Sequence, residues 1–192
     1  MSETERVARA AEPLSKLLRT LTPDQLTAPT PCAEFDVRAL LNHLLFWGPS
    51  LVGAASKAAV APPAAAETEV DLTADDWSTA LETQLGELAA AWRDPAAWQG
   101  TTRLGGPTEL PASLVGGIVV GELIVHGWDL ARALGTTVEW DDDLLDYVLD
   151  ETAATADQGR AMGIYGPEIP VAADAPLLDR ILGLTGRDPA GK

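Results

Sequence analysis

Hydrophobic residues recur at intervals of three and four along most of the chain, which is the spacing of amphipathic helices. The predicted helices cover residues 2–20, 37–59, 73–92, 112–134, 141–162 and, as a short last element, 174–186. Ser2 and Glu5 have the spacing of a capping box, and Asp36, Thr73 and Asp174 are predicted N-caps. Four long helices with short additional ones predict a four-helix bundle.

Proline and glycine mark the connectors between these helices. Residues 61–71 are rich in alanine and proline and are predicted to form a flexible linker within the bundle. Gly105, Gly106 and Pro107 separate two short segments within residues 101–110, which predicts a small hairpin at most. Strand patterns are otherwise almost absent, so the predicted fold class is all-α.

Length and charge limit the function classes. A chain of 192 residues is long enough for one domain with its own core, so residues 1–192 are predicted to form a single domain. The hydrophobic fraction of 46% is typical of a soluble globular protein. A formal net charge of −16 disfavours binding to nucleic acid and to anionic membrane surfaces.

The expected location is the cytoplasm. The acidic start of the chain lacks the apolar core of a secretory signal, and the single cysteine, Cys32, excludes an intrachain disulfide framework. The longest apolar run, from Leu114 to Ile124, is interrupted by Glu122 and is too short to span a membrane.

Three ionisable residues interrupt the apolar stripe of the helix predicted over residues 112–134. On a helical wheel, His126 lies about 40° to one side of Glu122 and Asp129 about 20° to the other. Val115, Ile118 and Val119 point in a similar direction. Ionisable side chains on a core-facing stripe must be paired, hydrogen-bonded or bound to a metal. The other histidine, His43, lies on the apolar face of the helix predicted over residues 37–59.

We therefore predict that His43, Glu122 and His126 hold one divalent metal ion. Two imidazoles and a carboxylate suit zinc best, and nickel, cobalt or manganese are compatible with the same ligand types. Three protein ligands leave one coordination position open, as in catalytic zinc sites. The alternatives are an ordinary core histidine at His43 and a helix ion pair between Glu122 and His126.

Four further residues are candidates for the surroundings of the site. Asp129 is either a hydrogen-bond acceptor behind the ligands or a substrate contact, with an ion pair to Arg132 or Arg38 as the alternative. Trp47, one turn after His43, is either a wall of the pocket or a core residue. Arg38 and Arg132 are candidates to bind an anionic substrate group, with surface ion pairing as the alternative.

Several motifs in this order resemble the mycothiol-dependent maleylpyruvate isomerase-like metal-binding family, part of the DinB-like four-helix bundle superfamily. They are Thr30-Pro31-Cys32, Asp36-Val37-Arg38, Leu41-Asn42-His43, the string from Glu122 to Ala131 containing His-Gly-Trp-Asp-Leu-Ala, and the ending Gly186-Arg187-Asp188-Pro189. The resemblance covers nearly the whole chain. It implies that His43, Glu122 and His126 match the metal ligands of the family.

The resemblance also implies a chemistry. Members of the family use the metal to activate mycothiol, or another low-molecular-weight thiol, for attack on a small electrophilic substrate. The family's isomerase is expected to continue into a further C-terminal domain, for which this chain, ending at Lys192, has no room. Thiol transfer is therefore expected ahead of isomerisation. A non-catalytic metal- or thiol-binding regulatory module and a purely structural metal are the alternatives, and the oligomeric state is left open between monomer and homodimer.

Overall fold

The computed structural model describes residues 2–191, and most of them are helical. The long helices are α1 (Glu3–Leu18), α2 (Val37–Ala55), α3 (Trp77–Ala91), α4 (Ala112–Ala133) and α5 (Asp142–Ala161), followed by the short α6 (Leu177–Leu184). Three 3-10 turns, η1 (Pro23–Thr27), η2 (Glu67–Glu69) and η3 (Pro95–Trp98), lie between them. The predicted all-α class is confirmed, including the small hairpin, in which β1 (Thr101–Arg103) pairs antiparallel with β2 (Glu109–Pro111).

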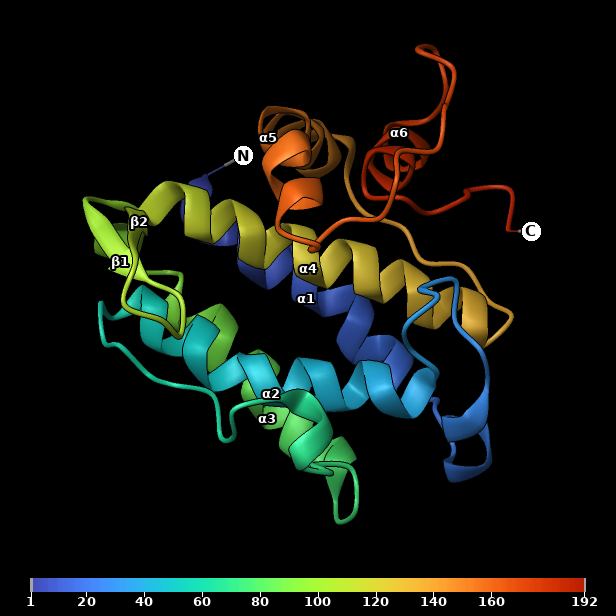
Figure 1. The fold of residues 1–192 in the computed structure, drawn as a ribbon, viewed down its shortest axis with the longest axis horizontal. Coiled ribbons are helices and arrows are strands. Elements are labelled where there is room, and N and C mark those ends of the chain that lie inside the picture. The colour runs from blue at the N-terminus through green and yellow to red at the C-terminus, as the bar shows by residue number, and fades with distance from the viewer. Residues whose placement is uncertain (1, 192) are drawn as a thin grey trace.

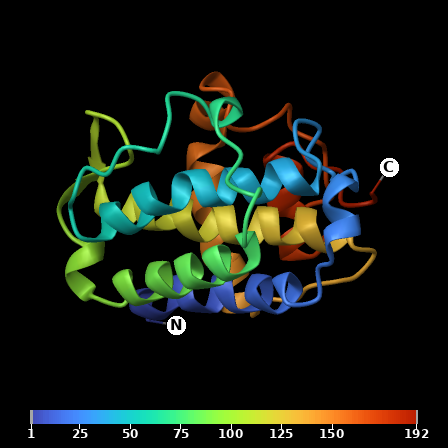
Figure 2. The ribbon, with the colours of Figure 1, turned by 90° about the horizontal axis from the view of Figure 1, so that it is seen from below.

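Helices α1 to α4 form the bundle. Helix α4 packs against α1 and α2, and α3 closes the bundle by packing against the same two helices. In Figure 1 the α2–α3 pair lies below α4, while α5 and α6 lie above it. Figure 2 shows α1, α2, α3 and α4 running side by side along the long axis of the molecule. Helix α4 is therefore covered by helices on both sides.

The central position of α4 explains its composition. It is long and apolar enough to cross a membrane, but 78% of its most apolar window is buried inside the protein. Small residues let neighbouring groups approach its backbone: a Cβ atom added at Gly116 would lie 2.4 Å from a ring carbon of Trp98. The run of apolar residues in α4 is therefore a core helix, and Glu122, His126 and Asp129 are polar exceptions within it.

Several predicted helix ends are wrong by a few residues. Helix α2 ends at Ala55 rather than residue 59, because Lys57 adopts a left-handed backbone conformation with φ of 61°. Helix α3 is capped by Asp76, whose carboxylate accepts from the backbone N–H of Thr79, and not by Thr73.

Two other predicted caps are also wrong. The hydroxyl of Ser2 contacts that of Thr4 instead of capping α1, and α6 begins after Pro176 rather than at Asp174. The cap predicted at Asp36 is confirmed, since its carboxylate accepts from the N–H of Ala39 at 2.8 Å.

Two glycines of α4 provide a matched test of this packing. Gly116→Ala is expected to lower the free energy of unfolding by about 1–3 kcal/mol, because the new methyl group meets rigid indole carbons. Gly121→Ala is expected to raise it by about 0.5–1 kcal/mol, because nothing lies within 4 Å of the added Cβ and alanine favours the helix. Urea denaturation measures both. Equal effects of the two substitutions would contradict the close packing at Gly116.

Candidate metal centre

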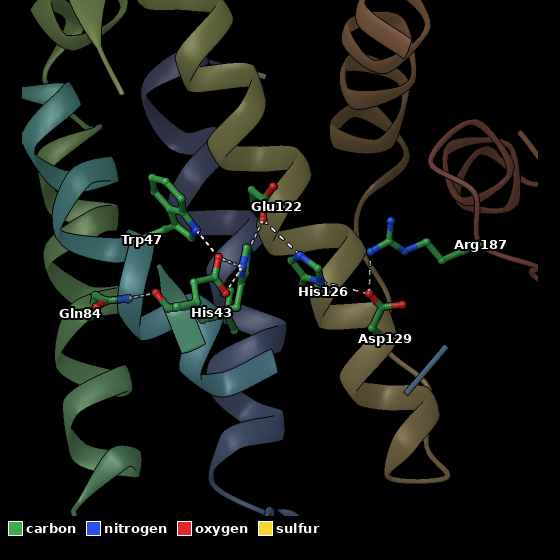
Figure 3. A network of polar contacts seen from close by, with 9 residues as sticks. His43, Trp47, Gln84, Glu122, His126, Asp129 and Arg187 are labelled. Atoms are coloured by element: carbon green, nitrogen blue, oxygen red, sulfur yellow. Dashed lines mark hydrogen bonds and ion pairs between the residues drawn. The ribbon is translucent and has the colours of Figure 1, made fainter. Parts of the chain in front are cut away.

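Helices α2 and α4 bring His43, Glu122 and His126 together. One ligand atom from each side chain lies within 4.8 Å of the other two. The Nε2 atom of His43 is 3.4 Å from Oε2 of Glu122, and Nε2 of His126 is 3.2 Å from the same oxygen. Figure 3 shows His43 reaching across from α2 to the two side chains of α4. The structure thus brings together the three residues that sequence reasoning selected as ligands.

The other nitrogen of each imidazole faces a different carboxylate. Nδ1 of His43 lies 3.1 Å from both carboxylate oxygens of Glu67, and Nδ1 of His126 lies 3.0 Å from Oδ2 of Asp129. An ionised carboxylate only accepts hydrogen bonds, so each Nδ1 carries a proton. In a neutral imidazole this leaves the lone pair on Nε2.

Three acceptor atoms consequently point at one position between α2 and α4. Without a positive charge there, two nitrogen lone pairs would face a carboxylate oxygen, which is unfavourable. Protons on the Nε2 atoms or a metal cation resolve the conflict. Ligands about 2.0–2.1 Å from a tetrahedral zinc lie roughly 3.3 Å apart. The two separations from Glu122, 3.4 and 3.2 Å, match that value, and all three ligand atoms lie within 4.8 Å of one another.

The pKa values in the metal-free protein reflect the same conflict. Burial lowers the pKa of His43, but hydrogen bonds to Glu122 and Glu67 outweigh it and raise the pKa to about 9. The pKa of His126 is also raised, because bonds to Asp129 and Glu122 outweigh the effect of burial. Burial raises the pKa of Glu122, but hydrogen bonds from His126 and His43 hold it well below its usual range. The site therefore favours bound positive charge.

Asp129 connects the centre to the end of the chain. Its side chain is fully buried, and Oδ2 accepts a hydrogen bond from the Arg187 guanidinium at 3.1 Å in addition to its contact with His126. Figure 3 shows Asp129 between these two side chains. The arginine that pairs with Asp129 is thus Arg187, and not Arg132 or Arg38, the partners considered in the ion-pair alternative.

Aromatic side chains border the centre. The ring of Phe35 lies 5.1 Å from that of His43 and 6.1 Å from that of His126, measured between centroids. Trp47 is half-buried, and its indole N–H donates to Oε1 of Glu67 at 2.7 Å. Trp47 therefore borders the centre through Glu67, and the Phe35 ring lies tilted beside both imidazoles.

A groove of about 470 Å³ lies beside the centre, between the start of α2 and the segment from Glu67 to Asp71. Phe35, Arg38, Asn42 and Glu67 are among its lining residues. A larger pocket of about 740 Å³ lies between α1 and α3, and none of the three ligand candidates lines it. None of the ligand candidates lines the smaller groove either, but two of its lining residues, Phe35 and Glu67, contact His43.

The two other candidate arginines differ in position. Arg38 lines the groove and donates to the Thr73 hydroxyl at 2.9 Å. The Arg132 guanidinium lies 5.9 Å from the Trp128 ring centroid, and among residues 2–191 the structure shows no contact between Arg132 and the ligand candidates. Of the two, the structure places Arg38 near the centre.

Glu67, Arg187 and Phe35 are the neighbours of the centre that sequence reasoning did not identify. Glu67 lies in the segment predicted to be a linker, 24 residues after His43, and Arg187 lies 58 residues after Asp129. Neither separation along the sequence corresponds to the repeat of a helix or a strand. The sequence offered one indication of such a partner: a buried carboxylate at Asp129 requires a nearby cation.

Comparison with known proteins identifies the family of this chain. Residues 7–131, well over half of the sequence, match the family described as the mycothiol maleylpyruvate isomerase N-terminal domain. The chain belongs to this family. Two uncharacterized proteins from two strains of Mycobacterium tuberculosis are each 27% identical to it over 185 residues, covering 93% of this chain and 94% of the relative.

Two solved structures share the fold. A mutant of mycothiol-dependent maleylpyruvate isomerase matches with a TM-score of 0.71 at 17% identity, covering all of this chain and 92% of that one. A second structure of mycothiol-dependent maleylpyruvate isomerase matches with a TM-score of 0.67 at 16% identity and 95% coverage of that chain.

That coverage corrects one expectation. The two isomerase chains extend little beyond the part that they share with this protein, so the expected further C-terminal domain does not separate them from it. The argument that placed thiol transfer ahead of isomerisation no longer holds.

The pKa shift of His43 makes the stability of the metal-free protein depend on pH. Its pKa of about 9 in the folded state exceeds the ordinary 6.5, so protonation stabilises the fold below pH 6.5. We expect the free energy of unfolding, measured by urea denaturation with a chelator, to fall as the pH rises from 6.5 through 9. Glu122→Gln should flatten this decline, because both histidines lose their shared anion. An equally steep decline in that variant would contradict the assignment.

Proposed function

We propose that this protein binds one divalent metal ion through His43, Glu122 and His126 and uses it in thiol chemistry. The observation that supports the metal is the convergence of one ligand atom from each of the three side chains. Glu67 and Asp129 accept from the Nδ1 atoms of the two histidines, so the Nε2 atom of each neutral imidazole is left to bind a metal. Zinc suits this nitrogen and oxygen ligand set best, and nickel, cobalt and manganese are alternatives.

The protein's own residues prepare the site for catalysis. Glu67 and Asp129 orient the two imidazoles, and Arg187 holds Asp129 in place. The Phe35 ring packs beside both imidazoles. Three protein ligands leave a coordination position for another molecule. The groove beside Glu67, whose lining residues Phe35 and Glu67 contact His43, offers room for the rest of that molecule.

We propose that this other molecule is a low-molecular-weight thiol, with mycothiol as the first candidate because of the family to which the chain belongs. A bound divalent ion favours the thiolate form of such a thiol at neutral pH, which makes it a nucleophile. The electrophile is a small molecule such as maleylpyruvate, either isomerised by reversible addition of the sulfur to its double bond or joined to the thiol by transfer. Arg38, in the groove, is the candidate contact for a carboxylate of that substrate.

Metal analysis tests the first part of the proposal. Protein purified without chelator should contain about one zinc or similar ion per chain, and His43→Ala, His126→Ala and Glu122→Gln should each lose it. Glu87→Gln, on the exposed face of α3, makes the same change in charge as Glu122→Gln and should keep the metal. A folded wild-type protein that takes up no zinc, nickel, cobalt or manganese would refute the metal site.

Activity assays test the second part. The metal-loaded protein should convert maleylpyruvate, or join an electrophile to the thiol, only when mycothiol or a related thiol is present. The His43→Ala and His126→Ala variants should fall to the background rate, because they lose the ion that activates the thiol. Thiol binding without turnover would instead support a non-catalytic regulatory module.

A further inference from the structure

Glu67 is the acidic residue that reaches the centre from outside the bundle helices. It lies in η2, within the segment that crosses the surface between α2 and α3. Both of its carboxylate oxygens lie 3.1 Å from Nδ1 of His43, and Oε1 lies 2.7 Å from the indole nitrogen of Trp47. Figure 3 shows His43 and Trp47, the two partners of Glu67, extending from α2.

The hydrogen-bonding roles in this contact are fixed by chemistry. An indole N–H can only donate, so Oε1 of Glu67 is an acceptor towards Trp47. A carboxylate accepts from His43 as well, which places the imidazole proton on Nδ1. In the neutral imidazole the lone pair then lies on Nε2, on the side of Glu122 and His126, as a metal ligand requires.

The backbone around Glu67 is attached to the same helix. The Asn42 side chain donates from Nδ2 to the carbonyl of Glu67 at 3.1 Å and accepts from the N–H of Leu72 at 2.8 Å. Three side chains of α2, those of Asn42, His43 and Trp47, therefore hold residues 67–72 against the bundle. This arrangement fixes the direction from which Glu67 approaches His43.

We propose that Glu67 is a positioning residue for the metal site and that residues 67–72 dock on α2 as part of that site. This inference rests on the proposed metal centre. Glu67 selects the tautomer and ring orientation of His43 without being one of the three ligands. Because docking of the segment favours metal binding, metal binding must favour docking of the segment by the same free energy.

A pair of substitutions within η2 tests the inference. Glu67→Gln keeps the size of the side chain but leaves a single acceptor oxygen for two donors, His43 and Trp47. Glu69→Gln removes the same charge two residues away, where the carboxylate accepts only from the backbone of Ala65 among the described contacts. Competition with a chromophoric chelator for zinc gives the dissociation constant of each variant. We expect Glu67→Gln to weaken zinc binding about 10–100-fold relative to Glu69→Gln.

Hydrogen exchange provides a readout that does not depend on activity. The amide of Leu72 donates to Asn42, so its exchange reports docking of the segment. Zinc should slow this exchange in the wild type and in Glu69→Gln, and should have little effect in Glu67→Gln. Thermal melts of the metal-free proteins show whether each variant is folded.

The outcomes separate this inference from the proposal on which it rests. If the wild type binds zinc and the two glutamine variants bind it equally well, with equal protection of Leu72, the positioning role of Glu67 is refuted and the metal site stands. If the folded wild type binds no divalent ion, the metal site and this inference both fall.

Discussion

The structure depends on placing three acceptor atoms at one point between two packed helices. Two imidazole nitrogens and a carboxylate oxygen cannot share such a position without a positive charge among them. The rest of the centre follows from this requirement. Each imidazole needs a carboxylate on its other side to fix its tautomer, and the buried Asp129 in turn needs Arg187. The repulsion among these three acceptor atoms is therefore relieved by polar groups from four parts of the chain. These parts are α2, η2, α4 and the C-terminal segment that contains Arg187.

The bundle supplies the rigidity that such a site requires. Glu122 and His126 are one turn apart on α4, the helix that is covered on both sides by other helices. His43 reaches them from α2, which packs directly on α4. Because all three ligand candidates lie on packed helices, their separations are set by the core and not by a surface loop.

The sequence predicted what regular spacing encodes and missed what depends on tertiary contact. The four-residue interval between Glu122 and His126 places both on one helix face, and His43 was the other imidazole on an apolar stripe. Glu67 and Arg187 have no such periodic relation to the centre, so the identity of these partners could not be read from spacing. The wrong helix ends have the same origin, since Asp76 and Thr73 were both capable caps and the fold selects one of them.

The four ionic groups around the two imidazoles also bear on the valence of the ion that we propose. Glu122, Glu67 and Asp129 contribute three negative charges, and Arg187 contributes one positive charge. The net charge of these four side chains is therefore about −2, which a doubly charged cation cancels. The same balance results without an ion when each imidazole carries a second proton, as the raised pKa values of His43 and His126 favour, so binding of a divalent ion would displace those protons.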